Sequence, residues 1–207
     1  MAHYGPQHWW PADSPFEVVV GAILTQSAAW VNVEKAIENL RAAGLLSPQG
    51  LLTVGLDELA RLIYPAGYYN AKARKLKAFV EVLFDRHGGD LDALFGLPVP
   101  QLRQELRAIH GIGQETADSI ILYAAEKPSF VIDAYTHRVF SRLGLEPAGD
   151  DYASWQGMFS EALPADVKLF KEYHALIDHH AKTVCRKVPL CPDCSLPAIC
   201  GWADQGG

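Results

Sequence analysis

The sequence has no cysteine in its first 184 residues and no apolar run near the roughly 18 residues that a membrane-spanning helix needs. Its N-terminus, MAHYGPQHWW, lacks the basic and then apolar pattern of a secretion signal, which weakens any interpretation as a disulfide-rich extracellular protein. Internal repeats, low-complexity tracts and heptads are also lacking. With 49% apolar residues, the 207 residues can bury one large core or two modest ones, and we expect no contact with a membrane.

The chain also lacks an excess of basic residues. Its formal net charge of −6 argues against a generic nucleic-acid binder. The basic residues are clustered, however, in two groups: Lys72, Arg74, Lys75 and Lys77, and then Lys182, Arg186 and Lys187. A local basic face on an acidic protein can still bind a phosphate backbone. A solvated helix face explains the first group equally well, and explains the second group less well because two of its members lie between cysteines.

Helical spacing of apolar residues dominates the chain and predicts an all-α fold. The clearest case is the segment 114–125, where Ala117, Ile120, Ile121 and Ala124 recur at the period of a helix. The apolar run 15–30 alone could be a buried strand, but its length and the helical stretch after it favour a helix. The predicted helices cover residues 15–30, 31–43, 56–63, 70–87, 99–109, 114–125, 135–143, 155–163 and 166–184.

All four cysteines lie close together near the C-terminus, in the pattern C-x5-C-x2-C-x5-C: Cys185, Cys191, Cys194 and Cys200. Four thiolates in so short a stretch can enclose one metal centre or form two disulfides, or the spacing can be accidental. The cysteine-free remainder of the chain favours a metal or cluster site. Tetrahedral thiolates suit both Zn and an iron–sulfur cluster, and spacing alone separates these two poorly.

A second motif is the tight turn His110-Gly111-Ile112-Gly113 between two predicted helices. Its glycines permit a positive φ and close approach by another molecule. The backbone N–H groups after the turn lie at a helix N-terminus, where they can bind an anion such as phosphate. An ordinary corner between two helices is the alternative.

Together these motifs resemble the helix–hairpin–helix DNA glycosylases of the endonuclease III type. The resemblance rests on GIGQETADSIILYAAEKPSFVIDAYTHRVFSRLG, on HALIDHHAKTVC and on the cysteine quartet, and it covers about residues 15–200. It implies two helical domains flanking a DNA-binding cleft: a six-helix domain at 14–127, and a domain of 1–13 and 128–207 that carries a [4Fe–4S] cluster, with Zn as the alternative. It also implies a cytoplasmic, nucleoid-associated monomer whose partner is double-stranded DNA with a damaged base. The first cysteine spacing is x5 here and commonly x6 in the family, which should tighten the loop of Arg186 and Lys187.

The resemblance implies that Asp133, in VIDAYTHR, is the catalytic aspartate. Cleaving a base from deoxyribose builds oxocarbenium character on the sugar, and a nearby carboxylate stabilises that charge and can orient or deprotonate water. Asp133 also precedes a predicted helix, so helix capping is the alternative interpretation. Both roles can coexist.

Glu115 departs from the pattern of the family's lyases. Those members carry a lysine at this place in the hairpin, and its amine attacks the sugar to form a Schiff base. A glutamate cannot do so, which implies a monofunctional glycosylase that uses water. The alternative is that Glu115 is simply a favourable acid in the first turn of a helix, and another basic residue could still supply some lyase activity.

The aromatic residues are most similar to those of the 3-methyladenine DNA glycosylases of this family, in which residues at the places of Trp9, Trp10 and Trp30 belong to the base pocket. A cationic N3- or N7-alkylated purine would stack on such rings by cation–π attraction. With Glu115 they form the predicted substrate pocket, and core packing is the alternative for each tryptophan. The best-known members of that subgroup lack the cluster. The mismatch-adenine branch fits less well, because it uses a glutamate where this chain has Gly21.

The predicted DNA-binding residues are Gly111, Gly113, Gln26, Arg186 and Lys187. Gln26 either enters the gap left by a flipped base or is a satisfied polar residue near a helix end. We interpret His174, His179 and His180 as structural or surface residues. The sequence thus predicts a monofunctional base-excision glycosylase for an alkylated purine. The alternatives are an oxidised-pyrimidine glycosylase with AP lyase activity and a non-catalytic damage-binding module.

Overall fold

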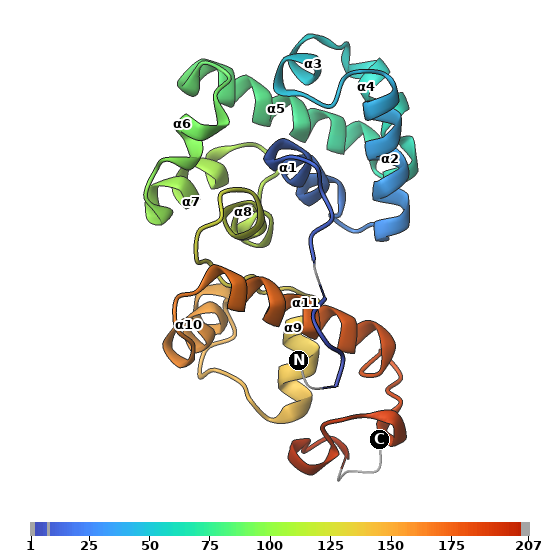
Figure 1. Cartoon of the computed structure of the whole chain (residues 1–207), viewed down its shortest axis with the longest axis vertical. Coiled ribbons are helices and arrows are strands. Elements are labelled where there is room, and N and C mark those ends of the chain that lie inside the picture. The colour runs from blue at the N-terminus through green and yellow to red at the C-terminus, as the bar shows by residue number, and fades with distance from the viewer. Residues whose placement is uncertain (1–2, 8, 204–207) are drawn as a thin grey trace. The chain divides into compact units, whose positions relative to one another are not determined.

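The computed structural model describes residues 3–7 and 9–203, and every regular element within them is helical (Figure 1). The predicted all-α class is therefore confirmed. Packing separates two compact units: one is Trp10–Lys127, and the other combines the N-terminal segment ending at Trp9 with the chain from Pro128 onward. The functional domains predicted at 14–127 and at 1–13 with 128–207, and the DNA-binding cleft, stay predictions.

The unit Trp10–Lys127 contains eight α-helices, of which six correspond to the six predicted there. The other two, α3 and α6, have six and five residues and are too short to show a helical period in the sequence. The elements are α1 (Pro15–Leu24), α2 (Trp30–Ala42), α3 (Pro48–Thr53), α4 (Leu56–Leu62), the 3-10 turn η1 (Tyr64–Ala66), α5 (Tyr69–His87), α6 (Leu91–Phe95), α7 (Val99–Ala108), α8 (Gln114–Ser119) and the π-helical segment η2 (Ile120–Ala124).

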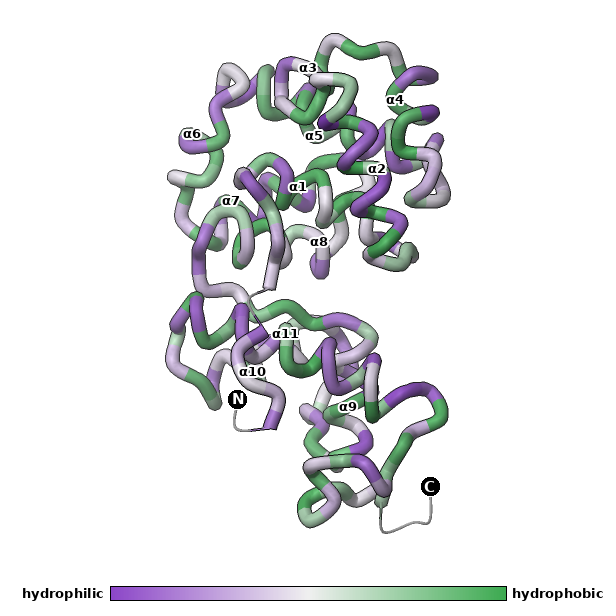
Figure 2. The backbone as a smooth tube through the Cα atoms, turned by 45° about the vertical axis from the view of Figure 1, so that its right-hand side comes forward, coloured by the Kyte–Doolittle hydropathy of each residue, from purple (hydrophilic) through white to green (hydrophobic). Residues whose placement is uncertain are grey.

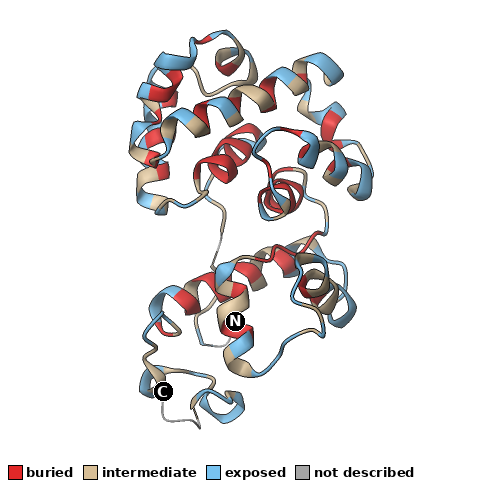
Figure 3. Cartoon of the chain, turned by 180° about the vertical axis from the view of Figure 1, so that it is seen from behind, coloured by how far each residue is buried: buried red, intermediate tan, exposed pale blue. Residues whose placement is uncertain are grey.

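Helix α1 forms the centre of this unit. It is apolar on nearly every side, and such a helix is stable only where it is buried all round. All its residues from Phe16 to Leu24 are buried, as Figure 3 shows, and it packs against α2, α5, α8 and η2. Ser14 caps its first turn by accepting a hydrogen bond from the Glu17 backbone N–H, and Pro15 occupies the first helical position, where its missing N–H is tolerated.

The prediction of one helix over 15–30 is wrong for its last turn and a half. Helix α1 ends at Leu24, and α2 begins only at Trp30. Thr25 turns its hydroxyl back to the carbonyl oxygens of Gly21 and Ala22, and Ser27 has a φ of 54°, a left-handed value that no α-helix continues through. As a result Gln26 lies in the connection between the two helices.

The second unit holds α9 (Ala134–Leu143), α10 (Tyr152–Ala162), α11 (Val167–Thr183) and two 3-10 turns, η3 (Cys191–Asp193) and η4 (Pro197–Ile199). Its core is aromatic: Phe130 stacks on Phe159 with ring centroids 4.1 Å apart, and Phe170 and Tyr173 meet Phe130 edge-on. The three α-helices begin at capping aspartates, Asp133, Asp151 and Asp166.

Hydrophobic and hydrophilic stretches alternate along helices such as α2 and α11 in Figure 2, as expected for helices with one buried face. None of the described helices is long and apolar enough to cross a membrane.

Candidate functional site

Asp133 combines a capping contact with a contact to a buried histidine. Its Oδ1 accepts hydrogen bonds from the Thr136 backbone N–H at 2.7 Å and the Thr136 hydroxyl at 2.9 Å. Its Oδ2 lies 3.6 Å from His174 Nε2, which comes from α11. Burial raises the pKa of Asp133, but the nearby imidazole of His174 and the two hydrogen bonds from Thr136 outweigh it and lower that pKa to about 2. The carboxylate is therefore ionised at neutral pH.

These contacts hold the negative charge of Asp133 in place and leave part of its side chain exposed to solvent. The Asp133 side chain keeps 14% of its surface exposed, so part of the side chain remains accessible. Such a group can stabilise developing positive charge or accept a proton from water. The interpretation of His174 as a structural or surface residue omits this contact. Its spacing from the other histidines gave no signal of it, because Asp133 and His174 meet only through the packing of α9 on α11.

The hairpin between α7 and α8 requires a glycine at one of its two glycine positions. Gly111 has a φ of 81°, and a Cβ there would lie 2.6 Å from Cδ of Lys75, so both the backbone and the space exclude a side chain. Gly113 has a φ of −85° and open space around it, which corrects the expectation that both glycines serve a positive φ. Both glycines and Glu115 are exposed.

Gln26 is hydrogen-bonded to this hairpin. Its Nε2 donates to the Gly111 carbonyl at 3.1 Å and to the Thr116 hydroxyl at 2.9 Å, and its Oε1 accepts from Lys75 Nζ. Of the two interpretations of Gln26, the satisfied polar residue describes this DNA-free arrangement. Insertion into a duplex would require these contacts to be exchanged for contacts with DNA.

The four cysteines are free thiols and line one cavity of the second unit, with apolar walls from Val139, Leu143, Val184 and Leu196. Donors also approach the sulfurs: Arg142 Nη1 lies 3.3 Å from Cys185 Sγ, and the Leu196 backbone N–H donates to Cys194 Sγ at 3.3 Å. Among the described residues, no three His, Cys, Asp or Glu side chains are grouped to hold a single metal ion. Four thiols that line one cavity are a donor set that suits both a tetrahedral Zn and an iron–sulfur cluster.

Two arginines of α9 hold the first cysteine loop. Arg138 donates to the carbonyls of Cys185 and Ala181 at 2.9 and 2.8 Å. Arg142 donates to the carbonyls of Arg186 and Lys187 at 2.7 and 3.0 Å. The backbone of the loop is thus fixed, while the side chains of Arg186 and Lys187 remain exposed. The sequence gave no signal for Arg138 and Arg142, since nothing in it reports which carbonyls they meet.

The predicted substrate-pocket residues divide between the two units. Trp10 and Trp30 meet edge to face with ring centroids 5.3 Å apart, and Tyr123 lies 5.2 Å from Trp10. The Trp10 indole also fills the space at Gly21, where an added Cβ would approach it to 3.0 Å. Trp9 belongs to the other unit, where its ring lies 6.2 Å from that of His174 and 5.2 Å from Lys182 Nζ.

Residues 20–164 match the family model described as HhH-GPD superfamily base excision DNA repair protein. The chain belongs to the HhH-GPD superfamily. It is 47% identical to a candidate DNA repair glycosylase of Methanocaldococcus jannaschii over 97% of this chain and 91% of that protein, and 29% identical to endonuclease III of Haemophilus influenzae over 93% and 86%. Among solved structures, the H. pylori 3-methyladenine DNA glycosylase bound to 1,N6-ethenoadenine matches with a TM-score of 0.77 and 26% identity, covering 86% of this chain and 90% of that one.

A non-covalent endonuclease III–DNA complex matches the fold with a TM-score of 0.80 at 24% identity, over 95% of this chain and 87% of that one. The predicted resemblance to helix–hairpin–helix glycosylases of the endonuclease III family is confirmed by these comparisons. The matched region of this HhH-GPD protein includes Asp133 and the hairpin, and it ends before the cysteines.

Proposed function

We propose that this protein is a monofunctional DNA glycosylase that hydrolyses the N-glycosidic bond of a flipped, alkylated purine such as 3-methyladenine. The observation that carries the proposal is the ionised carboxylate of Asp133, whose partly exposed side chain is held by Thr136 and lies beside His174. Membership of a base-excision repair superfamily supplies the reaction class, and the residues of this chain supply the details.

Asp133 acts on the sugar and on water. As the bond between C1′ and the base nitrogen breaks, the fixed negative charge stabilises the oxocarbenium character of the sugar. Asp133 then accepts the proton of the water molecule whose oxygen bonds to C1′, and the bonding electrons leave with the base. An N3- or N7-alkylated purine already carries positive charge, so it departs as a neutral base without a general acid.

Glu115 supports the monofunctional assignment. It is exposed in the first turn of α8, and a carboxylate cannot form a Schiff base with C1′. The product is therefore an abasic site in an unbroken strand. The amine of Lys75 donates to Gln26, which is itself bonded to this hairpin. If strand cleavage is seen, its loss in a Lys75→Ala variant would identify Lys75 as the source.

DNA would bind through the exposed Gly111–Gly113 hairpin, Gln26, and the side chains of Arg186 and Lys187. The group that we propose for the four cysteines is a [4Fe–4S] cluster, with Zn as the alternative, because all four thiols line one cavity. When bound, such a cluster fixes the loop that presents Arg186 and Lys187, and no chemical step at the sugar requires it.

The test is base release by wild type, Asp133→Asn and Asp151→Asn from methylated duplex DNA. Asp151 is the matched control, because it caps α10 with the same pair of bonds, from the Ser154 backbone N–H and hydroxyl, that Asp133 receives from Thr136. Asparagine preserves a helix cap. We expect Asp133→Asn to lose release by at least about a hundredfold while keeping DNA affinity, and Asp151→Asn to behave as wild type.

Reading each reaction with and without alkali separates the alternatives. Release of 3-methyladenine, with strand breaks only after alkali, supports the proposal. Cleavage at thymine glycol without alkali would establish the oxidised-pyrimidine glycosylase with lyase activity instead. DNA binding that Asp133→Asn leaves intact, with no base released by wild type from either substrate, would establish a non-catalytic module.

A further inference from the structure

An open groove of the unit Trp10–Lys127 joins the two tryptophans to a set of charged side chains. Trp10 and Trp30 line the groove. The Trp10 ring is held in place because it packs between Trp30, Tyr123 and the backbone of Gly21. The charged residues that line the groove come from α1, α2 and the segment before α1. The acidic ones are Asp13, Glu17, Glu34 and Glu38, and the basic ones are Lys35 and Arg41.

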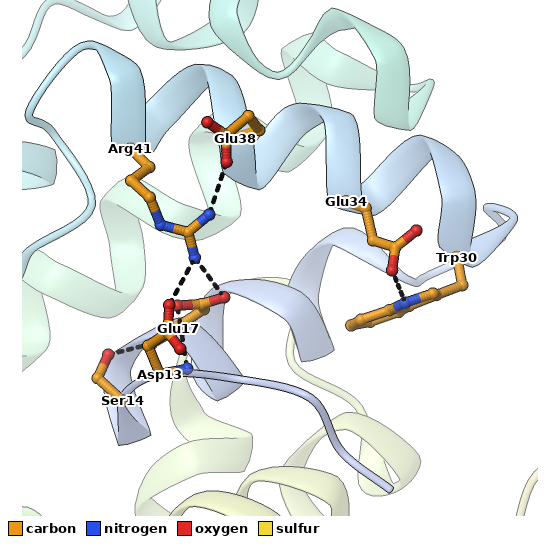
Figure 4. A network of polar contacts seen from close by, with 7 residues as sticks. All are labelled: Asp13, Ser14, Glu17, Trp30, Glu34, Glu38 and Arg41. Atoms are coloured by element: carbon orange, nitrogen blue, oxygen red, sulfur yellow. Dashed lines mark hydrogen bonds and ion pairs between the residues drawn. The ribbon is translucent and has the colours of Figure 1, made fainter.

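Three of the four carboxylates share one counter-charge. Arg41 forms ion pairs with Asp13 at 3.2 Å, with Glu17 at 2.9 Å and with Glu38 at 2.7 Å. Figure 4 shows the Arg41 guanidinium reaching from α2 to the start of α1, with these three carboxylates around it. The single positive charge of Arg41 offsets only part of these three negative charges, so this part of the groove keeps a net negative charge.

Glu34, the fourth carboxylate of the groove, has a different partner. Its Oε1 accepts a hydrogen bond of 2.7 Å from the indole Nε1 of Trp30, four residues earlier on α2 (Figure 4). The indole N–H is neutral, so this bond positions the carboxylate without cancelling its charge. It also polarises the indole, which increases the electron density that the ring presents to a cation.

We propose that Glu34 sets the charge selectivity of this groove, so that it binds a positively charged nucleobase in preference to a neutral one of the same shape. This rests on the proposed function for its biological substrate, an alkylated purine, but the selectivity is a property of the groove itself. Two electron-rich rings, the Glu34 carboxylate bonded to one of them, and a lining with more carboxylates than basic side chains all favour a cation, and the same excess of negative charge disfavours a phosphate group. The groove therefore suits a base rather than the DNA backbone.

The size of the effect follows from Coulomb attraction at an exposed site. A unit charge about 6 Å from a cationic base contributes about a threefold preference at the dielectric constant of water and about a tenfold preference at a dielectric constant of about 40. Glu34→Gln is the appropriate variant, because a glutamine Oε1 still accepts the bond from Trp30 while the charge is lost. Glu81→Gln, on an exposed position of α5 outside the groove, is the matched control for net charge.

The experiment compares two nucleosides as quenchers of tryptophan fluorescence at neutral pH: 1-methyladenosine, which is a cation, and adenosine, which is neutral. Wild type and Glu81→Gln should bind 1-methyladenosine more tightly, and Glu34→Gln should lose about three- to tenfold of that preference while adenosine binding stays unchanged. Equal binding of the two nucleosides by wild type, absence of binding by both, or an unchanged ratio in Glu34→Gln would each overturn the inference. So would an equal loss for both nucleosides, which would show that Glu34 only positions Trp30.

Release of 3-methyladenine from methylated duplex, measured on the same three proteins, separates this inference from the proposed function. A preference for the cationic nucleoside without any base release would leave the inference standing and remove the alkylated-purine assignment. Base release at the wild-type rate by Glu34→Gln, together with an unchanged ratio of nucleoside affinities, would overturn the inference about Glu34 and leave the alkylated-purine assignment standing.

Discussion

The Oδ2 of Asp133 lies 3.6 Å from Nε2 of His174, while its Oδ1 is fully engaged in capping α9. The two carboxylate oxygens therefore have separate tasks. One fixes the orientation of the group on its helix, and the other faces a histidine whose proximity opposes the effect of burial on the pKa of Asp133. Loss of His174 leaves burial, which raises the pKa, opposed by Thr136 alone.

His174→Ala should therefore raise the pKa of Asp133 from about 2 and make base release sensitive to mild acid. Release requires the ionised carboxylate, so the rate falls as pH drops through the pKa of Asp133. We expect the wild-type rate to show no loss from this group between neutral pH and about pH 4, and the His174→Ala rate to decline within that range. Single-turnover release at several pH values measures both profiles. His179→Ala, on the same helix, should keep the wild-type profile, and a His174→Ala profile identical to it would refute the assignment.

Gly111→Ala and Gly113→Ala should differ although the residues are two positions apart. At Gly111 a methyl group meets both a φ of 81° and the stem of Lys75, whereas Gly113 has an ordinary φ and open space. We expect Gly111→Ala to lower the free energy of unfolding by about 1–3 kcal/mol and Gly113→Ala to change it by less than about 1 kcal/mol. Thermal or denaturant unfolding gives both values. Equal losses would mean that the hairpin shifts freely to accommodate a side chain.

Hydrophobic periodicity and local sequence motifs predict most of the helices of this protein. The stripe Ala117, Ile120, Ile121 and Ala124 predicts the α8–η2 stretch because burial of one helix face is a local property of the sequence. The exchange from α-helical to π-helical hydrogen bonding at Ile120 leaves no such trace, since the apolar positions remain compatible with both. The turn at 25–29 escaped prediction because the segment Thr25-Gln26-Ser27 contains no glycine or proline to mark a break between the two helices.

Only some residues of the candidate site can be predicted from the sequence. Asp133 and the cysteines stand out because their motifs are contiguous in the chain. His174, Arg142 and Glu34 do not, because what matters about each is a partner brought near by tertiary packing or by the placement of one side chain. Trp9 and Trp10 show the converse: they are adjacent in sequence and contact different sets of residues.

Arg186 and Lys187 should contribute to DNA binding through the phosphate backbone. Their side chains are exposed on a loop whose carbonyls are held by Arg142, so two positive charges have fixed positions. Each lost phosphate contact reduces the slope of log K against log salt by about 0.9. The Arg186→Ala/Lys187→Ala double variant should therefore lower that slope by up to about 1.8 for duplex DNA of any sequence. The double variant Arg61→Ala/Lys168→Ala removes the same charge elsewhere, and a reduction of equal size there would reject a specific contact.

Arg142→Gln should loosen the cysteine loop without unfolding the protein. In wild type, this side chain donates to the carbonyls of Arg186 and Lys187, lies 3.3 Å from Cys185 Sγ and stacks over Trp202 at 5.1 Å from the ring centroid. A glutamine keeps a polar side chain but loses the guanidinium fork that reaches two carbonyls at once. We expect lower iron and sulfide content per chain, a weaker absorbance near 400 nm, and faster loss of both on exposure to a chelator. Arg142→Lys should restore only part of the difference, because one ammonium cannot replace the fork. Iron content equal to that of wild type in both variants would show that the thiolates hold the group without help from α9.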